Sequence, residues 1–252
     1  MFDLKGKVAV VTGGNGGIGL GMARGLASAG ARIVVAARNP EKSAAAVTEL
    51  QRYGGAHLAI ETDVSDEKAV TSLVARTIER CGRLDILVNN AGINVRKPAD
   101  RLALDEWRSV IDTNLTSAFL CSRAAHGPMT QAGGGKIVNI GSMMSIFGAS
   151  FAPAYGASKG GLVQLTKSLA VAWAPDNIQV NAVLPGWIDT DLTRAARQQV
   201  DGLHESVLRR TPAGRWGVID DFAGIAIFLA SPASDFITGA TITVDGGWSI
   251  QG

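Results

Sequence analysis

The chain has few of the residues on which metal sites and disulfide frameworks depend. Its 252 residues include two cysteines, Cys81 and Cys121, which lack the C-x-x-C spacing of a redox or zinc motif. The three histidines, His57, His126 and His204, lie far apart and lack the spacing of metal ligands. The sequence therefore predicts no metal site, and it predicts plain thiols in a reducing compartment.

Long apolar runs and a strong net charge are also absent. The longest apolar runs are shorter than the ~20 residues of a membrane span. The first residues contain no basic segment followed by an apolar run. The formal net charge is +2, which gives no electrostatic case for nucleic-acid binding. We therefore expect a cytoplasmic protein that binds neither nucleic acid nor membrane.

The chain alternates between short apolar strands and amphipathic helices. Buried strands are expected at 7–12, 32–37, 57–61, 84–88, 136–140, 178–183 and 240–244. Helices are expected at 18–29, 40–53, 65–80, within 104–129, at 153–173 and at 220–230. This pattern predicts an α/β fold with a single domain at 1–252. Its doubly wound parallel sheet would have about seven strands, with helices on both faces.

A glycine-rich turn follows the first strand. It reads Thr12-Gly13-Gly14-Asn15-Gly16-Gly17-Ile18-Gly19. Glycines there permit positive φ and a close approach to a pyrophosphate, and the helix behind them presents unpaired N–H groups. This context predicts a dinucleotide site and favours an open Rossmann sheet over a (β/α)8 barrel. The residues expected to contact the cofactor are Gly13, Asn15, Gly16, Gly17, Ile18 and Gly19.

The end of the second strand indicates which nicotinamide cofactor is bound. An acidic residue there would hydrogen-bond the ribose 2′-OH of NAD, but the sequence reads Ala36-Ala37-Arg38-Asn39. Arg38 is placed either to meet a 2′-phosphate or, as a loop residue, to stack on the adenine. We therefore predict NADP(H) as the preferred cofactor, with NAD(H) as the alternative.

Tyr155 and Lys159 are four residues apart, which puts them on one face of the helix expected at 153–173. A tyrosine hydroxyl normally loses its proton near pH ~10. A neighbouring ammonium group would lower that pKa, so that the pair could exchange a proton with an alcohol oxygen. The Y-x-x-x-K spacing is common by chance, and its weight depends on the other motifs.

Taken together, the motifs resemble the short-chain dehydrogenase/reductase family over essentially the whole chain. The matching segments are Thr12-Gly13-x-x-x-Gly17-x-Gly19, Asp63-Val64, Asn89-Asn90-Ala91-Gly92, Asn114, Ser142, Tyr155-x-x-x-Lys159 and Pro185-Gly186. The resemblance implies an NAD(P)-dependent oxidoreductase that interconverts a secondary alcohol and a ketone.

The resemblance also implies a role for each matching residue. Tyr155 would be the general acid or base, and Ser142 would hydrogen-bond the substrate oxygen. Lys159 would bind the nicotinamide ribose, and Asn114 would bend its helix and hold a water molecule. The cofactor contacts implied are Asp63 and Val64 at the adenine, Asn90, Ala91 and Gly92 beside the cofactor, Pro185, Gly186, Ile188 and Thr190 after the sixth strand, and Tyr155 and Lys159.

The sequence defines the substrate less closely. A stretch at 187–217 lacks clear strand character and is expected to form a lid with short helices. The segment from Ile93 to Pro98, with Arg210 to Gly217, resembles bacterial members that act on sugar acids such as gluconates. Its cations would suit a carboxylate, or they lie at a solvated rim or subunit contact. Because the stretch 143–147 is apolar, an apolar ketone or a 3-oxoacyl thioester is an alternative substrate.

Two further functions are alternatives. A non-redox enzyme on the same fold would need a carbanion or leaving-group partner, for which no dedicated residue is evident. A non-catalytic, cofactor-sensing protein is disfavoured by the intact set of Ser142, Tyr155 and Lys159. The family implies a homotetramer built on the helices around 104–129 and 153–173. The other expected partner is a small carbonyl or alcohol substrate.

Overall fold

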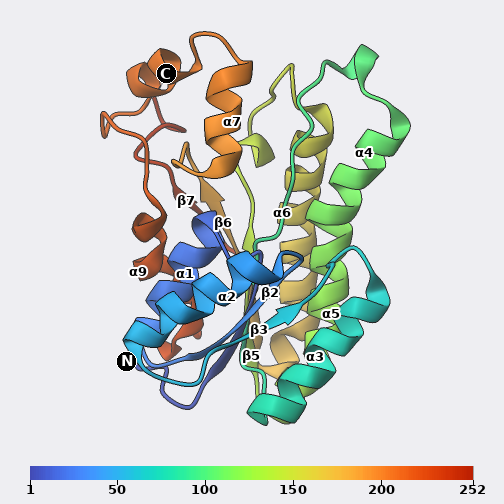
Figure 1. The fold of residues 1–252 in the computed structure, drawn as a ribbon, viewed down its shortest axis with the longest axis vertical. Coiled ribbons are helices and arrows are strands. Elements are labelled where there is room, and N and C mark those ends of the chain that lie inside the picture. Colours follow the sequence, from blue (N-terminus) through green and yellow to red (C-terminus); the bar gives the residue numbers. More distant parts are fainter. Residues whose placement is uncertain (252) are drawn as a thin grey trace.

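The computed structural model describes residues 1–251, and its strands form one parallel sheet (Figure 1). The strands are Val8–Thr12 (β1), Arg32–Ala37 (β2), Leu58–Glu61 (β3), Ile86–Asn89 (β4), Gly135–Ile140 (β5), Ile178–Pro185 (β6) and Thr241–Val244 (β7). Their order is β3-β2-β1-β4-β5-β6-β7, and every neighbouring pair is parallel. The predicted doubly wound sheet of about seven strands is confirmed.

Helices cover both faces of the sheet. They are Gly17–Ser28 (α1), Pro40–Leu50 (α2), Glu67–Cys81 (α3), Leu104–Ile111 (α4), Ser117–Gln131 (α5), Pro153–Trp173 (α6), Asp191–Gln199 (α7), Leu203–Arg210 (α8) and Ala223–Ala230 (α9). Figure 1 shows α1 and α9 on one side of the sheet, and α3, α5 and α6 on the other. In the part of the chain that the structure describes, no helix combines the length and apolarity that a bilayer crossing needs.

The apolar strands are explained by burial on both faces. Successive residues of a strand point to opposite sides of the sheet. Val8 and Val10 of β1 therefore join the apolar core that includes residues of α3, α5 and α6, while Ala9 and Val11 join the core that includes α1 and α9. A strand covered on both sides is an unbroken apolar run rather than an alternating one.

The strand order positions the site. From β1 the chain builds outward through β2 to β3, and it then returns to place β4 on the other side of β1. In such sheets the carboxyl ends of the strands on either side of this reversal leave a crevice for ligands. The glycine turn after β1 lies at this edge, as do the segments that follow β4, β5 and β6.

Two helical glycines give a matched test of how α1 packs against the turn before α9. A Cβ added to Gly21 would lie 2.0 Å from the carbonyl oxygen of Ile219, a backbone atom that cannot rotate aside. We expect Gly21→Ala to lower the free energy of unfolding by about 2–3 kcal/mol. A Cβ on the exposed Gly224 of α9 would meet nothing within 4 Å. Gly224→Ala should therefore raise the free energy of unfolding by up to ~1 kcal/mol. Urea unfolding compares them, and equal stability of the two variants would contradict this packing.

Candidate active site

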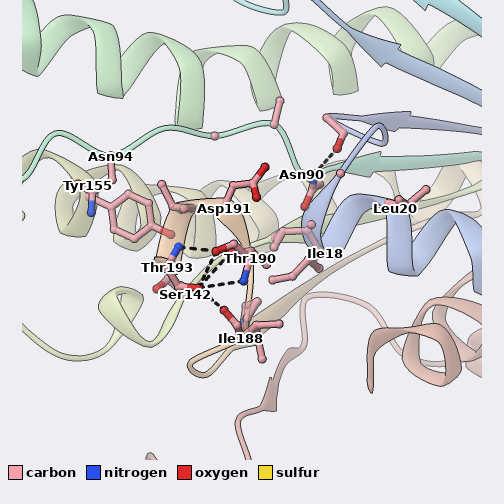
Figure 2. A pocket seen from close by; sticks show the side chains of 18 of the residues that line it. Ile18, Leu20, Asn90, Asn94, Ser142, Tyr155, Ile188, Thr190, Asp191 and Thr193 are labelled. Carbon is pink, nitrogen blue, oxygen red and sulfur yellow. Dashed lines mark hydrogen bonds between the residues drawn. The ribbon is translucent and has the colours of Figure 1, made fainter. Parts of the chain in front are cut away.

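The carboxyl ends of the central strands open into a cavity of about 650 Å³, a size that suits a cofactor with a small substrate. Its walls come from the glycine turn and from the segments that follow β4, β5 and β6 (Figure 2). It brings together most of the predicted site residues. They are Gly13, Asn15, Gly16, Gly17, Ile18, Asn90, Ala91, Gly92, Ser142, Tyr155, Lys159, Pro185, Gly186, Ile188 and Thr190.

The glycine turn forms an open cradle at the start of α1. Gly13 and Gly17 have φ of 62° and 51°, a region that favours glycine. A Cβ on Gly16 would meet nothing within 4 Å. Gly19 instead faces the protein, because a Cβ there would lie 2.4 Å from Nδ2 of Asn90. The exposed backbone of the turn, at a helix N-terminus, fits a pyrophosphate.

The residues predicted to bind the adenine end lie outside the cavity lining. Arg38 is 67% exposed, and its Nη1 lies 4.0 Å from Oδ2 of Asp63. Val64 is buried in the core. The structure adds Lys42, which lies in the first turn of α2, four residues after Arg38, lines the cavity and lies 3.6 Å from the carboxylate of Asp191. Its spacing from Arg38 is the signal that could have identified it from the sequence.

Lys159 is buried at the base of the cavity. It is 4% exposed, and its Nζ donates a hydrogen bond of 2.6 Å to the carbonyl oxygen of Ile140. The same Nζ lies 5.6 Å from the centre of the Tyr155 ring. Burial disfavours the ammonium form and lowers the pKa of Lys159 to about 8. The amine can therefore exchange a proton close to neutral pH.

The pKa of Tyr155 moves in the opposite direction from the sequence expectation. Burial of the phenol raises it, and the Ser142 hydroxyl and the charge of Arg96 oppose this rise. The lowering expected from Lys159 is not seen in this structure, in which burial lowers the pKa of Lys159 to about 8, below the raised pKa of the phenol. The cation that acts on the phenol is Arg96, which lies on a different segment.

A π-helical turn at Asp112–Thr116 interrupts the helix expected within 104–129, and Asn114 lies in this turn. Asn114 is 2% exposed and its carboxamide is fully engaged. Its Nδ2 donates to the carbonyl oxygen of Ile93 at 2.9 Å and to Oγ of Ser158 at 3.0 Å, and its Oδ1 accepts from the Ile93 N–H at 2.8 Å. Asn114 therefore joins the segment after β4 to α6. Its role in holding a water molecule stays a prediction.

Two neighbouring cations after β4 have different surroundings. Arg96 lines the cavity and donates to Oε1 of Gln199 at 3.1 Å and to the carbonyl oxygen of Leu192 at 3.0 Å. Burial lowers the pKa of Arg96, and within residues 1–251 no carboxylate forms an ion pair with it. Lys97 pairs with Glu106 at the surface. Of these two cations, only Arg96 lines the cavity, and it does so without a carboxylate partner in residues 1–251.

The stretch at 187–217 is closed at its neck. The N–H of Asp189 donates to the carbonyl oxygen of Gly217, and the N–H of Gly217 donates to that of Trp187, both at 2.9 Å. Thr190 and Thr193 cap the start of α7 beside the cavity, as the dashed lines in Figure 2 show. The segment is therefore joined at its two ends, and residues of its first part, between Trp187 and Thr193, line the cavity.

Other cations near this segment are engaged within the protein. Arg197 pairs with Asp189 and lies 4.2 Å from the centre of the Trp216 ring. Arg210 lies 3.8 Å from the Trp248 ring and donates to the Trp248 carbonyl oxygen. These contacts occupy the two guanidinium groups, and neither residue lines the cavity.

The chain is similar to known proteins over almost its whole length. A family model described as Enoyl-(Acyl carrier protein) reductase matches residues 13–249. The 2-dehydro-3-deoxy-D-gluconate 5-dehydrogenase of Dickeya dadantii (strain 3937) is 44% identical over 249 residues, 98% of this chain and 97% of that protein. The gluconate 5-dehydrogenase of Gluconobacter oxydans (strain 621H) is 38% identical, covering 100% and 98%. The crystal structure of a gluconate 5-dehydrogenase from Burkholderia cenocepacia J2315, in complex with NADP and tartrate, matches with a TM-score of 0.93 at 41% identity, covering 99% and 97%.

The two tyrosines of the chain allow a matched test of the cavity hydroxyl. Tyr155→Phe removes the proton donor, and we expect kcat to fall by ~10²–10⁴-fold with little change in cofactor affinity. Tyr53 is 46% exposed and lies outside the cavity lining, so Tyr53→Phe should leave kcat unchanged. Steady-state turnover and cofactor fluorescence titration measure both quantities. Near-normal turnover of the Tyr155→Phe variant would remove Tyr155 from the chemistry.

Proposed function

The chain belongs to the short-chain dehydrogenase/reductase family, and from that premise we propose that it interconverts a hydroxyl and a ketone on a sugar acid of the gluconate class, with NADP(H) as cofactor. Its activity is that of an NAD(P)-dependent oxidoreductase. The similar proteins named above are dehydrogenases of gluconates, and one was crystallised with NADP and tartrate, a hydroxy acid.

The residues of the cavity fit this cofactor. The cradle formed by the glycine turn would hold the pyrophosphate, and the exposed Arg38 would meet the 2′-phosphate. Lys159 would meet the nicotinamide ribose, the backbone of Ile188 would meet the carboxamide, and Thr190 would contact the cofactor. When bound, the nicotinamide supplies or accepts the hydride.

The protein's own residues would manage the proton. A raised pKa keeps Tyr155 protonated at neutral pH, so that in the reducing direction its hydroxyl gives a proton to the substrate oxygen. Ser142 would hydrogen-bond the same oxygen. The charge of Arg96 favours the phenolate that remains. Lys159, with a pKa of about 8, would help to return the proton. In oxidation Tyr155 is the base.

Arg96 is the observation that carries the sugar-acid assignment. A partly desolvated guanidinium without a carboxylate partner in the described chain is costly unless an anion completes it. Arg96 lines the cavity together with Tyr155, and its charge acts on the phenol. A substrate that bears a carboxylate a few carbons from its reacting hydroxyl would engage both groups.

The remaining predictions concern assembly and motion. We propose that 187–217 acts as a lid on the single domain, since α7 supplies both hydrogen-bond acceptors of Arg96. A homotetramer is supported by the exposed Trp107 and Phe119 on α4 and α5 and by Val171 on α6. A cytoplasmic location stays a prediction.

Arg96→Gln tests the carboxylate contact. Loss of the charge should raise KM for gluconate and lower kcat/KM by roughly 10- to 100-fold, since hydrogen bonds to charged groups contribute ~1.5–3 kcal/mol. Activity on a neutral polyol should change less. Lys97→Gln is the matched control, because Lys97 is neutralised by Glu106 outside the cavity lining. If Arg96→Gln lowered kcat/KM equally for gluconate and polyol, the carboxylate contact would be refuted.

The same variant should change the pH dependence of oxidation. Arg96 lowers the pKa of Tyr155, so its removal raises that pKa further. The rise of kcat with pH, which follows ionisation of the base, should therefore move to higher pH in Arg96→Gln. A pH profile of kcat at saturating gluconate measures the shift. A pH profile that stayed in place or moved to lower pH would show that Arg96 does not act on the phenol.

Arg38→Asp tests the cofactor. An acidic side chain would repel the 2′-phosphate and accept hydrogen bonds from a ribose 2′-OH. We expect KM for NADPH to rise by roughly 10- to 100-fold and the NADPH-to-NADH preference to reverse or vanish. Arg52→Asp, at an exposed position outside the cavity lining, is the control for the charge change. An unchanged cofactor ratio would assign the phosphate to other residues.

A further inference from the structure

Asn94 has a buried side-chain oxygen with no hydrogen-bond partner. In the described chain, such buried polar atoms occur on His57, Asn89, Asn94, Arg197 and Trp216. Of these residues, Asn94 alone lines the cavity. An unpaired buried acceptor costs ~1–3 kcal/mol. Asn94 lines the cavity as a residue, but this oxygen is itself closed to solvent, so the carboxamide must turn before a ligand can donate the missing hydrogen bond.

The backbone on both sides of Asn94 is held in place. Asn114 bonds both the N–H and the carbonyl of Ile93. Two residues after Asn94, the side chain of Arg96 is tied to α7 through Leu192 and Gln199. The carboxamide of Asn94 is therefore presented from a fixed segment rather than from a free loop, which is what selective recognition requires.

The position of Asn94 relates it to both ends of the proposed substrate. Figure 2 shows Asn94 and Tyr155 among the side chains that line the same pocket. Arg96, which would take the carboxylate, follows on the same segment, and its charge acts on the Tyr155 phenol. A substrate that engaged both Tyr155 and Arg96 would therefore pass along the part of the wall to which Asn94 belongs.

We propose that Asn94 is a specificity-determining residue that accepts a hydrogen bond from a substrate hydroxyl on the carbons between the reacting centre and the carboxylate. This inference rests on the proposed function and names a second group that the substrate must carry. A substrate without that hydroxyl leaves the Asn94 oxygen unpaired and is rejected. An apolar ketone, which the apolar stretch at 143–147 would otherwise accommodate, is excluded on the same ground.

The test compares D-gluconate with its 2-deoxy, 3-deoxy and 4-deoxy analogues on wild type and Asn94→Leu. Wild type should prefer gluconate over at least one analogue by roughly 10- to 100-fold in kcat/KM. Asn94→Leu should bring that preference to within about threefold, because it loses activity on gluconate and little on the analogue. Asn94→Ala, which adds no bulk, should do the same.

The outcomes separate the two proposals. If wild type turned over none of these acids, the proposed function would fail and Asn94 would lose its role with it. If wild type were active and both variants kept every wild-type preference, only the role of Asn94 would be overturned. Melting temperature and NADPH affinity show whether the variants are folded. A tenfold loss of NADPH affinity with the preferences intact would assign Asn94 to the cofactor and also overturn the proposal.

Discussion

The carboxamide of Asn114 makes the contacts on which the geometry of the site depends. It forms hydrogen bonds with the N–H and the carbonyl oxygen of Ile93 and with the hydroxyl of Ser158. That hydroxyl in turn donates to the carbonyl oxygen of Tyr155. The segment after β4 and the helix that carries Tyr155 and Lys159 are therefore one unit. The π turn makes this arrangement part of the helix itself, and such turns often occur at functional sites. Because Asn114 is buried, each of these bonds replaces one with water.

Burial gives the cavity its chemical character. It raises the pKa of Tyr155 and lowers those of Lys159 and Arg96, so it disfavours the charged form of each group. Interactions among these groups are stronger where water is excluded. The bonds from Arg96 to α7 connect this electrostatic arrangement to the segment at 187–217. The same few contacts thus position the charge of Arg96, the hydroxyl of Tyr155 and the proposed lid at 187–217.

The fold could be predicted almost completely because its signals are local. Apolar runs such as Val8–Thr12 need two covered faces, and both are present. The glycine turn was expected to require positive φ, which Gly13 and Gly17 have. Helix boundaries agree within a few residues, apart from the π turn at Asp112–Thr116, since a single inserted residue leaves little trace in a 3.6-residue period.

By itself the sequence determined the sheet, the cradle after β1, and the shared helix face of Tyr155 and Lys159, because each depends on spacing along one element. Only the tertiary structure decided which cation acts on the phenol, which of two adjacent cations enters the cavity, and that the oxygen of Asn94 is unpaired. Desolvation and charge pairing depend on every element packed around a group, and residues distant in the sequence provide that environment.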